Sequence, residues 1–590
     1  MSGKPFKLDL LNLGGGLNDG VAPSHIQDNE FSRLVNFYPF GSKLTSRRGS
    51  VRITSSAYGE RLTSIFRFKK GTANWQLMVG TRSGIARLSG TVLVPLAIAT
   101  GTTISASDEP WRFIQYQNEM IAVRRASGLP KRVTEDVVMD AGIPPPSAAP
   151  TLVDGSAGSK IAGDYYGVFT AFNRDSNAES DPSPVSTKLT LGASKLIAWS
   201  GITTSTNAQV NARRLYLTVP NNKGRYYFVK QLDDNVTTTT TEDVVQDNYG
   251  RAVSFDNAIP PTNLELIESW LERAWYSDGV DLFYSEQGLP QSVGEFNRIS
   301  VYADDGHRIR GLRAWGDRLA VGKTNAMHTV LSAGPRRFEL VTLSDAHGLA
   351  AADTLQTAEG LLFWLAPDNV YRSEGVGANA ISTITIRRIL DRVPEVMKEK
   401  AAAGIYPRLS WYVLAVAVDG AAANNLLLIY NYKTNGWTTF SYPNVPAFLA
   451  HFLTEDAGEV LYGVHGADNH VYRLDTGADD WGTAVTATAR SKAFDYGQPG
   501  FRKGVRRIQV LTPRLAESLT VRVYNDETDT VVKERTISLY SDGWKRINLS
   551  TIGKAGELHQ IELEYSGRSP LDIEGLIIEG LLLPRHSPVL

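Results

Sequence analysis

A pattern of hydrophobic residues recurs seven times along this chain. In each copy an aliphatic or aromatic run is broken by a short Gly, Asp or Asn turn, and a second run follows. This pattern predicts paired antiparallel strands around a tight turn. Seven such units at loose spacing indicate a β-propeller, in which each blade buries its faces against its neighbours. The copies span residues 75–88, 111–130, 272–290, 309–330, 360–371, 411–437 and 460–474.

Helical patterns are few, and most other windows alternate with period two and are rich in Val, Ile, Thr, Tyr and Trp. That texture favours strands. Residues 28–37 place Phe31, Leu34 and Val35 on one helical face, which predicts a short helix. Residues 391–403 predict a second short helix, with a proline in its first turn and a glycine after its end.

Proline runs at residues 143–146 and 260–261 mark two boundaries. Between them lie short alternating strands without a helical signal, which suits a β-sandwich of the immunoglobulin or fibronectin type. The last stretch alternates in the same way and predicts a jelly-roll-like C-terminal β-sandwich. The expected all-β architecture is an N-terminal arm with a short helix (1–50), a first propeller part (51–146), an inserted sandwich (147–261), a second propeller part (262–480) and a C-terminal sandwich (481–590).

Composition narrows the class of protein. The 590 residues are 42% hydrophobic and 21% charged, normal for a soluble folded chain. A formal net charge of −1 excludes a global basic field of the kind found on nucleic-acid coats. The absence of cysteine excludes disulfides, thiolate metal sites and cysteine nucleophiles. We find neither a signal peptide pattern nor an apolar run of membrane-spanning length, so we expect a soluble protein without classical export.

Three segments resemble chemical motifs, and each has a simpler interpretation. Residues 316–324 (GDRLAVGKT) resemble a phosphate-binding loop, but five residues separate the glycines and no helix is expected to follow, so a blade turn is favoured. His465, Asp468 and His470 could ligate a metal, but a solvated hairpin tip suits the Gly/Asp/Asn context better. Gly14-Gly15-Gly16 lacks the strand and acidic partner of a dinucleotide site and indicates a flexible arm.

Catalysis is not expected. Sialidase-like propeller hydrolases need an arginine cluster, a nucleophilic tyrosine and an acid, and nothing in the sequence shows such residues converging. We therefore expect no enzyme activity, no catalytic residue, no cofactor, no metal and no small-molecule substrate. A basic run at residues 490–492, 502–503 and 506–507 could contact DNA phosphates or an acidic partner, although a solvated strand face is the favoured interpretation.

The first 50 residues contain a spaced motif of Gly15-Gly16-Leu17-Asn18, Asn29-Glu30, Asn36 and Arg47-Arg48-Gly49. This spacing resembles the opening of tail proteins from short-tailed bacteriophages. Three further segments are similar to other parts of those tail proteins. They are FYSEQGLP at residues 283–290, NYKTNGW at 431–437 and the polar stretch at 177–184.

The resemblance implies a tail nozzle, also called tail tubular protein B or packaged-DNA stabilisation protein. Such proteins form a six-copy ring below the portal and the head-to-tail adaptor proteins, extend the DNA channel, help retain packaged DNA and carry tail fibre or spike proteins. The implied partners are therefore copies of the same chain, adaptors, fibres or spikes, and double-stranded DNA passing without sequence preference. The implied location is the virion tail, after synthesis in the cytoplasm of a bacterial host.

Two other functions stay open, a host-glycan-binding tail adhesin and a propeller glycosidase. The absence of collagen-like or heptad repeats argues for a hub over a trimeric adhesin. We expect Trp275, Trp315, Trp364 and Trp437 to pack in blade cores. We also expect the arm to pack against the propeller or a neighbouring subunit as an assembly segment. Its residues are Gly15, Gly16, Leu17, Asn18, Asn29, Glu30 and Asn36.

Overall fold

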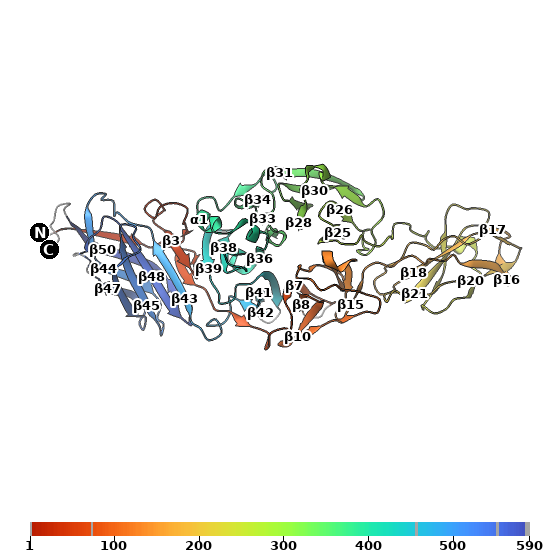
Figure 1. Ribbon diagram of the computed structural model, residues 1–590, viewed down its shortest axis with the longest axis horizontal. Helices are drawn as coiled ribbons and strands as arrows, with labels where there is room; N and C mark the ends of the chain where they lie inside the picture. Colours follow the sequence, from red (N-terminus) through yellow and green to blue (C-terminus); the bar gives the residue numbers. More distant parts are fainter. Residues whose placement is uncertain are drawn as a thin grey trace.

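The computed structural model describes residues 3–71, 75–454, 458–465, 467–549, 551 and 554–583. The molecule is elongated, with three β-rich parts in line (Figure 1). A propeller occupies the middle, the inserted sandwich forms one end, and the C-terminal sandwich forms the other. Within the described part of the chain, no helix is long and apolar enough to cross a membrane.

The predicted propeller is present, and within the described residues it has seven blades, a number that the sequence left open. Each of the seven repeated segments lies in a different blade. The innermost strands contact one another in succession, and β40 contacts β7, so the ring is closed. These strands are β7 (Leu62–Phe68), β12 (Arg112–Tyr116), β24 (Leu266–Trp270), β28 (Ile309–Trp315), β32 (Gln356–Ala358), β36 (Ala402–Tyr406) and β40 (Phe448–Thr454).

The remaining blade strands follow outward from the axis in antiparallel order, apart from the parallel outermost strand β11. The first blade continues with β8 (Gln76–Thr81), β9 (Ile85–Ser89) and β10 (Val92–Pro95), and the second with β13 (Glu119–Val123), β14 (Lys131–Val133), β15 (Val137–Asp140) and β11 (Ala97–Ile98). The third continues with β25 (Arg273–Ser277), β26 (Asp281–Tyr284) and β27 (Arg298–Ser300), and the fourth with β29 (Arg318–Lys323), β30 (Met327–Gly334) and β31 (Arg337–Ser344). In the last three they are β33 (Leu361–Leu365), β34 (Val370–Ser373) and β35 (Asn379–Ala380); β37 (Trp411–Val416), β38 (Leu426–Asn431) and β39 (Gly436–Phe440); and β41 (Gly458–His465) and β42 (His470–Leu474).

The last blade is completed by a strand from the start of the chain. Strand β6 (Val51–Arg52) pairs antiparallel with β42, with Val51 opposite Arg473 and Arg52 opposite Tyr472. The blade tryptophans pack between sheets as predicted, because Trp275, Trp364 and Trp437 are fully buried and Trp315 is nearly so. Burial of such large side chains is a main source of stability in the four blades that contain them.

The inserted sandwich leaves the propeller between β15 and β24 and forms the end opposite the chain termini (Figure 1). Phe169, Trp199 and Leu215 are among the buried residues of its own core. One of its two main sheets contains β16 (Thr151–Lys160), β20 (Lys195–Ser200) and β23 (Thr240–Glu242). The other contains β18 (Gly167–Phe172), β21 (Ala212–Leu217) and β22 (Tyr227–Leu232). Strands β17 (Gly163–Tyr165) and β19 (Leu189–Leu191) form a small additional pair.

The C-terminal sandwich is built from both ends of the chain. One sheet has the order β1 (Lys4–Leu10), β50 (Gly575–Leu583), β44 (Arg502–Thr512) and β47 (Gly543–Asn548). The other has β3 (Glu30–Val35), β43 (Val485–Ser491), β48 (His559–Gly567), β45 (Ser518–Asn525) and β46 (Val531–Ser538). Strand β2 (Gly16–Leu17) pairs with β3, and β4 (Phe37–Phe40), β5 (Lys43–Ser46) and β49 (Asp572–Ile573) form a third, small sheet.

Strand β3 also joins the sandwich to the propeller. It lies between β43 and β39, so one sheet runs from the sixth blade into the sandwich. A single hydrophobic core follows the same path and includes Leu34, Trp437 and Leu563. The arm is thus an integral part of the sandwich and of its junction with the propeller.

The helix predicted over residues 28–37 is wrong, because this segment contains strand β3. Phe31 and Leu34 are both buried in the same core although a regular strand would place them on opposite faces. The pairing with β43 shifts register between Phe31 and Arg33. A β-bulge of this kind adds one residue and brings positions three apart to one face, which imitates helical spacing.

The helix predicted over residues 391–403 is correct only in part. Two short helices, α1 (Arg387–Asp391) and α2 (Glu395–Lys398), replace it, and Ala402, Ala403 and Gly404 already belong to β36. Pairing of β36 with β37 outweighs the helical propensity of the alanines. Short 3-10 helices are η1 (Arg125–Ser127), η2 (Gln246–Asn248), η3 (Ala303–Asp305), η4 (Ala352–Thr354) and η5 (Pro407–Leu409).

Candidate functional site

The two halves of the predicted assembly segment contact each other. The backbone N–H of Gly15 donates to the carbonyl of Asn29 at 3.1 Å, and that of Asn18 donates to the carbonyl of Phe31 at 2.8 Å. The side-chain amide of Asn18 donates to Glu30 Oε2 at 3.0 Å. Gly16 and Leu17 form β2, which pairs in parallel with the start of β3. The motif therefore fixes β2 beside β3.

Asn36 connects three parts of the fold. It adopts a left-handed backbone conformation, with φ at 58°, between β3 and β4. Its Oδ1 accepts hydrogen bonds from Arg47 Nε and from the backbone of Ser441, both at 2.9 Å. Its Nδ2 donates to the carbonyl of Thr486 at 2.7 Å. The arm, the end of the sixth blade and the C-terminal sandwich meet at this side chain. We call the surrounding residues Gly16, Asn36, Arg47, Trp437 and Asp480 the arm joint.

The segment that resembles a phosphate-binding loop is a blade hairpin, as expected. It follows β28, turns at Gly316 and continues as β29, and no helix follows it in this described stretch. The ammonium group of Lys323 is buried and donates to the carbonyls of Val301 and Tyr302, each at 2.8 Å, and to Asp305 at 2.7 Å. Lys323 therefore holds the loop after β27 and does not face a phosphate site.

The two histidines of the second candidate have separate partners. His465 Nδ1 lies 3.2 Å from Asp468 Oδ1, whereas His470 Nδ1 lies 2.8 Å from the hydroxyl of Thr54. Both flank the β41–β42 turn, where they are cross-strand neighbours. In the described ranges, no group of three or more His, Cys, Asp or Glu side chains could hold a metal ion.

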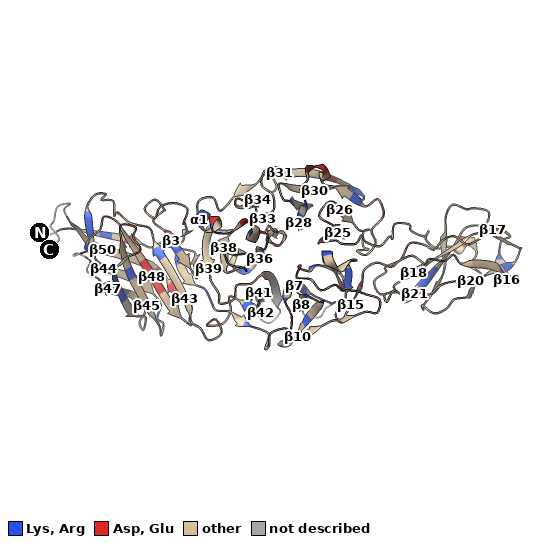
Figure 2. Cartoon of the chain, viewed as in Figure 1, with Lys and Arg blue, Asp and Glu red and all other residues tan. Residues whose placement is uncertain are grey.

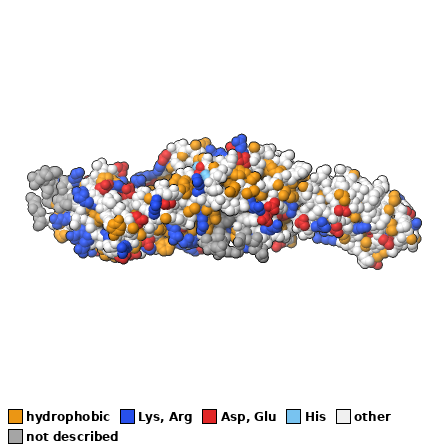
Figure 3. All heavy atoms as spheres, turned by 90° about the horizontal axis from the view of Figure 1, so that it is seen from below, with side chains coloured by type: hydrophobic (Ala, Val, Ile, Leu, Met, Phe, Trp, Pro, Cys, Tyr) orange, Lys and Arg blue, Asp and Glu red, His pale blue; other side chains and the backbone are white. Residues whose placement is uncertain are grey.

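The basic run of the last domain is divided among local partners. Arg490 pairs with Asp529 at 2.8 Å and covers the ring of Tyr524 at 3.6 Å. Lys492 pairs with Asp28 at 2.8 Å. Lys503 is fully buried, and its pKa is lowered mainly by burial. Lysine, arginine and acidic residues lie close together on the strands of this sandwich (Figure 2). A second view also shows basic and acidic side chains interspersed along the visible face (Figure 3).

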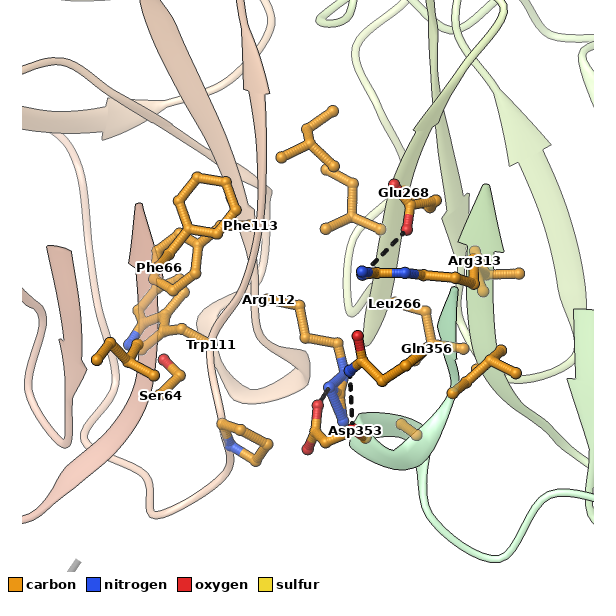
Figure 4. A pocket seen from close by; sticks show the side chains of 18 of the residues that line it. Ser64, Phe66, Trp111, Arg112, Phe113, Leu266, Glu268, Arg313, Asp353 and Gln356 are labelled. Carbon is orange, nitrogen blue, oxygen red and sulfur yellow. Dashed lines mark hydrogen bonds and ion pairs between the residues drawn. The ribbon is translucent and has the colours of Figure 1, made fainter. Parts of the chain in front are cut away.

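A cavity of about 770 Å³ lies on the propeller axis, where the innermost strands converge. Residues from β7, β12, β24, β28, β32, β36 and β40 line it, so every blade contributes. We call it the axial cavity. Its aromatic wall contains Phe66, Phe113 and Trp111, and the rings of Phe66 and Phe113 stack with centroids 5.4 Å apart. Figure 4 shows this wall facing Arg313, Glu268 and Gln356.

Three arginines and two carboxylates line the axial cavity. Arg112 pairs with Asp353 at 2.8 Å, and Arg313 lies 3.8 Å from Glu268 (Figure 4). Burial raises the pKa of Glu268, although Arg313 opposes that shift. Burial lowers the pKa of Arg67, and the like charge of Arg313 lowers it further.

Sequence reasoning missed the axial cavity. Its arginines stand beside aromatic or aliphatic residues in the first strand of a blade, as in IFRF, WRFI and LRAW. An arginine at a position that should face the propeller axis was the available signal. Convergence of the three arginines depends on ring closure and cannot be read from one segment.

Comparison with known proteins identifies no family. No protein family and no curated protein matches the sequence. Among solved structures, the WD40 domain of Neurospora crassa Pan2 aligns with 73% of this chain and 95% of its own at 10% identity and a TM-score of 0.27. The extracellular domain of BT4673 from B. thetaiotaomicron aligns with 95% of this chain and 64% of its own at 10% identity and a TM-score of 0.29.

An enzyme is also among the similar structures. The exo-β-1,3-galactanase of Phanerochaete chrysosporium aligns with 90% of this chain and all of its own at 8% identity and a TM-score of 0.20. Likenesses at this level carry no argument about function. The fold is all-β, a propeller combined with β-sandwiches.

Proposed function

We propose that this chain is a structural subunit of a bacteriophage tail, a nozzle or hub that assembles into a six-copy ring below the portal and adaptor. In this role it extends the DNA channel, helps retain packaged DNA and anchors fibres or spikes during DNA ejection. The observation that carries the proposal is the N-terminal motif that resembles short-tailed phage proteins. Three residues of this motif, Gly16, Asn36 and Arg47, belong to the arm joint, where Asn36 and Arg47 are hydrogen-bonded to each other.

The shape of the molecule supports this proposal. A closed ring of identical subunits with head-to-tail contacts needs two different complementary surfaces on each subunit. An elongated chain with a different sandwich at each end of a propeller offers such surfaces (Figure 1). The interspersed charges in Figure 3 suit a component beside moving DNA, because a continuous basic surface would bind phosphates tightly and slow passage.

The first experiment measures the copy number of this chain in purified tailed particles against the portal protein, by quantitative mass spectrometry. We expect about half as many copies as portal subunits, since the resemblance implies a six-copy ring below a portal that usually has twelve. Absence from particles would overturn the proposal. A copy number that scales in threes with fibres would favour the glycan-binding adhesin and would also overturn it.

A second experiment locates the subunit within the particle. The loop of residues 221–225 is exposed at the β21–β22 turn of the inserted sandwich. A short peptide tag inserted there should be tolerated, because exposed loop tips accept insertions. Electron microscopy with an antibody against the tag should show six labels around the tail axis. Labels confined to fibre tips would contradict the nozzle assignment.

A further inference from the structure

Three arginines from three different blades line the axial cavity. Arg67 comes from β7, Arg112 from β12 and Arg313 from β28. Arg112 is compensated by Asp353, at 2.8 Å. Among the residues that the structure describes, Arg67 has no carboxylate within ion-pair distance; its guanidinium covers the ring of Trp75 at 4.9 Å.

Arg313 is only weakly compensated. Its guanidinium lies 3.8 Å from Glu268, near the upper limit of an ion pair, and its side chain, which lines the cavity, is 39% exposed. Arg67 and Arg313 line the same cavity, and the positive charge of Arg313 lowers the pKa of Arg67 further than burial alone does. Two neighbouring cations without full compensation favour an anion between them.

The rest of the axial cavity suits an organic ligand. Its volume of about 770 Å³ falls within the range of small-molecule sites, and its lining combines polar groups with aromatic side chains. Phe66 and Phe113 present stacked rings on the side opposite Arg313 (Figure 4). A flat apolar body can pack on such rings while its acidic group meets the guanidinium groups.

We propose that the axial cavity binds a small organic anion, with its carboxylate or phosphate group held by Arg67 and Arg313 and its apolar body against Phe66 and Phe113. Guanidinium groups bind carboxylates and phosphates through paired hydrogen bonds, which a lysine cannot reproduce. The site is independent of the proposed role in the tail, since it lies within one propeller.

Isothermal titration calorimetry with the full chain tests this proposal. The probes are benzoate, neutral benzamide of nearly the same shape, and inorganic phosphate. We expect saturable binding of benzoate or phosphate and at least about tenfold weaker binding of benzamide, because the charge supplies most of the selectivity. Binding of phosphate alone assigns the ligand to the phosphate class. Equal binding of benzamide and benzoate, or no saturable binding of either anion, overturns the proposal.

Variants identify the residues responsible. Arg67→Gln and Arg313→Gln should each weaken binding of the anion by about tenfold or more, equivalent to about 1.4 kcal/mol. Arg225→Gln is the matched control, because Arg225 is exposed in the inserted sandwich. Glu268→Gln should tighten anion binding several-fold by removing a nearby carboxylate, and a misfolded protein could not give such a gain. Unchanged affinity in both arginine variants, or weaker binding in Glu268→Gln, overturns the assignment.

Discussion

The guanidinium of Arg47 and the carboxylate of Asp480 form a buried ion pair that joins the N-terminal arm to the end of the last blade. Nη2 of Arg47 lies 2.6 Å from Oδ2 of Asp480, and the two side chains are 1% and 5% exposed. Ser50 donates a further hydrogen bond to Oδ1 at 2.8 Å, and Tyr442 lies under the guanidinium at 3.8 Å. Both charges are thus fully engaged, at the point where propeller and sandwich meet.

Asp480→Ala should lower the free energy of unfolding by about 3–5 kcal/mol, because it leaves the charge of Arg47 buried without its partner. Differential scanning calorimetry of the full chain measures the loss. Asp108→Ala is the matched control, since the pair of Asp108 with Arg61 is half exposed at 3.7 Å. A pair of that kind contributes about 0–1 kcal/mol. Similar losses in the two variants would contradict the structural role of Arg47 and Asp480.

Substitution of two glycines in the arm distinguishes the cost of backbone strain from the cost of steric contact. Gly16 and Gly41 both have positive φ, at 80° and 63°. A Cβ on Gly16 would lie 2.9 Å from the carbonyl oxygen of Trp437, whereas a Cβ on Gly41 would meet nothing within 4 Å. Gly41→Ala should therefore cost only about 1–2 kcal/mol of left-handed strain. Gly16→Ala should cost about 1–3 kcal/mol more, because β2 must move away from β39.

Thermal unfolding of Gly16→Ala and Gly41→Ala under identical conditions checks this ordering. The arm joint is also the place that the phage-like motif occupies, so the Gly16 variant tests whether that motif serves folding. If Gly41→Ala were the more damaging change, the contact between β2 and Trp437 would not be limiting.

Local pairing explains what the sequence could predict. Each repeated segment contains two strands that are adjacent in the sequence and pair with each other, as β33 pairs with β34, where Trp364 lies opposite Tyr371. Such hairpins depend on a period of two and a turn, which a short window contains. The inserted sandwich is also local, since its core residues lie between Leu152 and Leu232.

Non-local pairing explains what the sequence could not predict. Val51 pairs with Arg473 to complete the seventh blade, and Lys4 pairs with Leu582 in the C-terminal sandwich. No window contains both members of these pairs. The helix predicted over residues 28–37 was wrong for a similar reason. The bulge near Phe31 spaces buried residues as in a helix, and only the pairing with the distant strand β43 shows the shift in register. Arg67 and Arg313 likewise line one cavity only because the ring closes.

Trp275, Trp315, Trp364 and Trp437 pack in blade cores and do not line the axial cavity. Trp275 is fully buried, donates from Nε1 to the carbonyl of Trp270 at 3.1 Å and packs edge-on against Phe338 at 4.8 Å. Trp275→Ala should lower the free energy of unfolding by about 3–5 kcal/mol. Trp544→Ala, at a position 39% exposed, is the control and should cost much less. Chemical unfolding followed by far-UV circular dichroism compares them, and equal costs would refute the core assignment.

His559 gives the C-terminal sandwich a defined response to acid. Its side chain is fully buried, and burial lowers its pKa to about 4, with a smaller opposing effect of Asp526 and a reinforcing one of Lys503. A histidine in the unfolded chain has a pKa of about 6.5. Between about pH 4 and about pH 6.5 the unfolded chain therefore binds more protons at this position than the folded chain does. The stabilisation from neutral His559 is therefore complete above about pH 6.5 and is lost as the pH falls toward about 4.

Thermal unfolding of the full chain between pH 7 and pH 4 tests this response. We expect the melting temperature of the sandwich transition to fall over that window, by an amount corresponding to a few kcal/mol, since each pKa unit is about 1.4 kcal/mol. His559→Gln removes the titrating group and should make the dependence shallower. His25→Gln, at an exposed ring, should keep the slope of the natural sequence. If all three proteins lost stability in parallel, the carboxylates would dominate the acid response and His559 would not be its source.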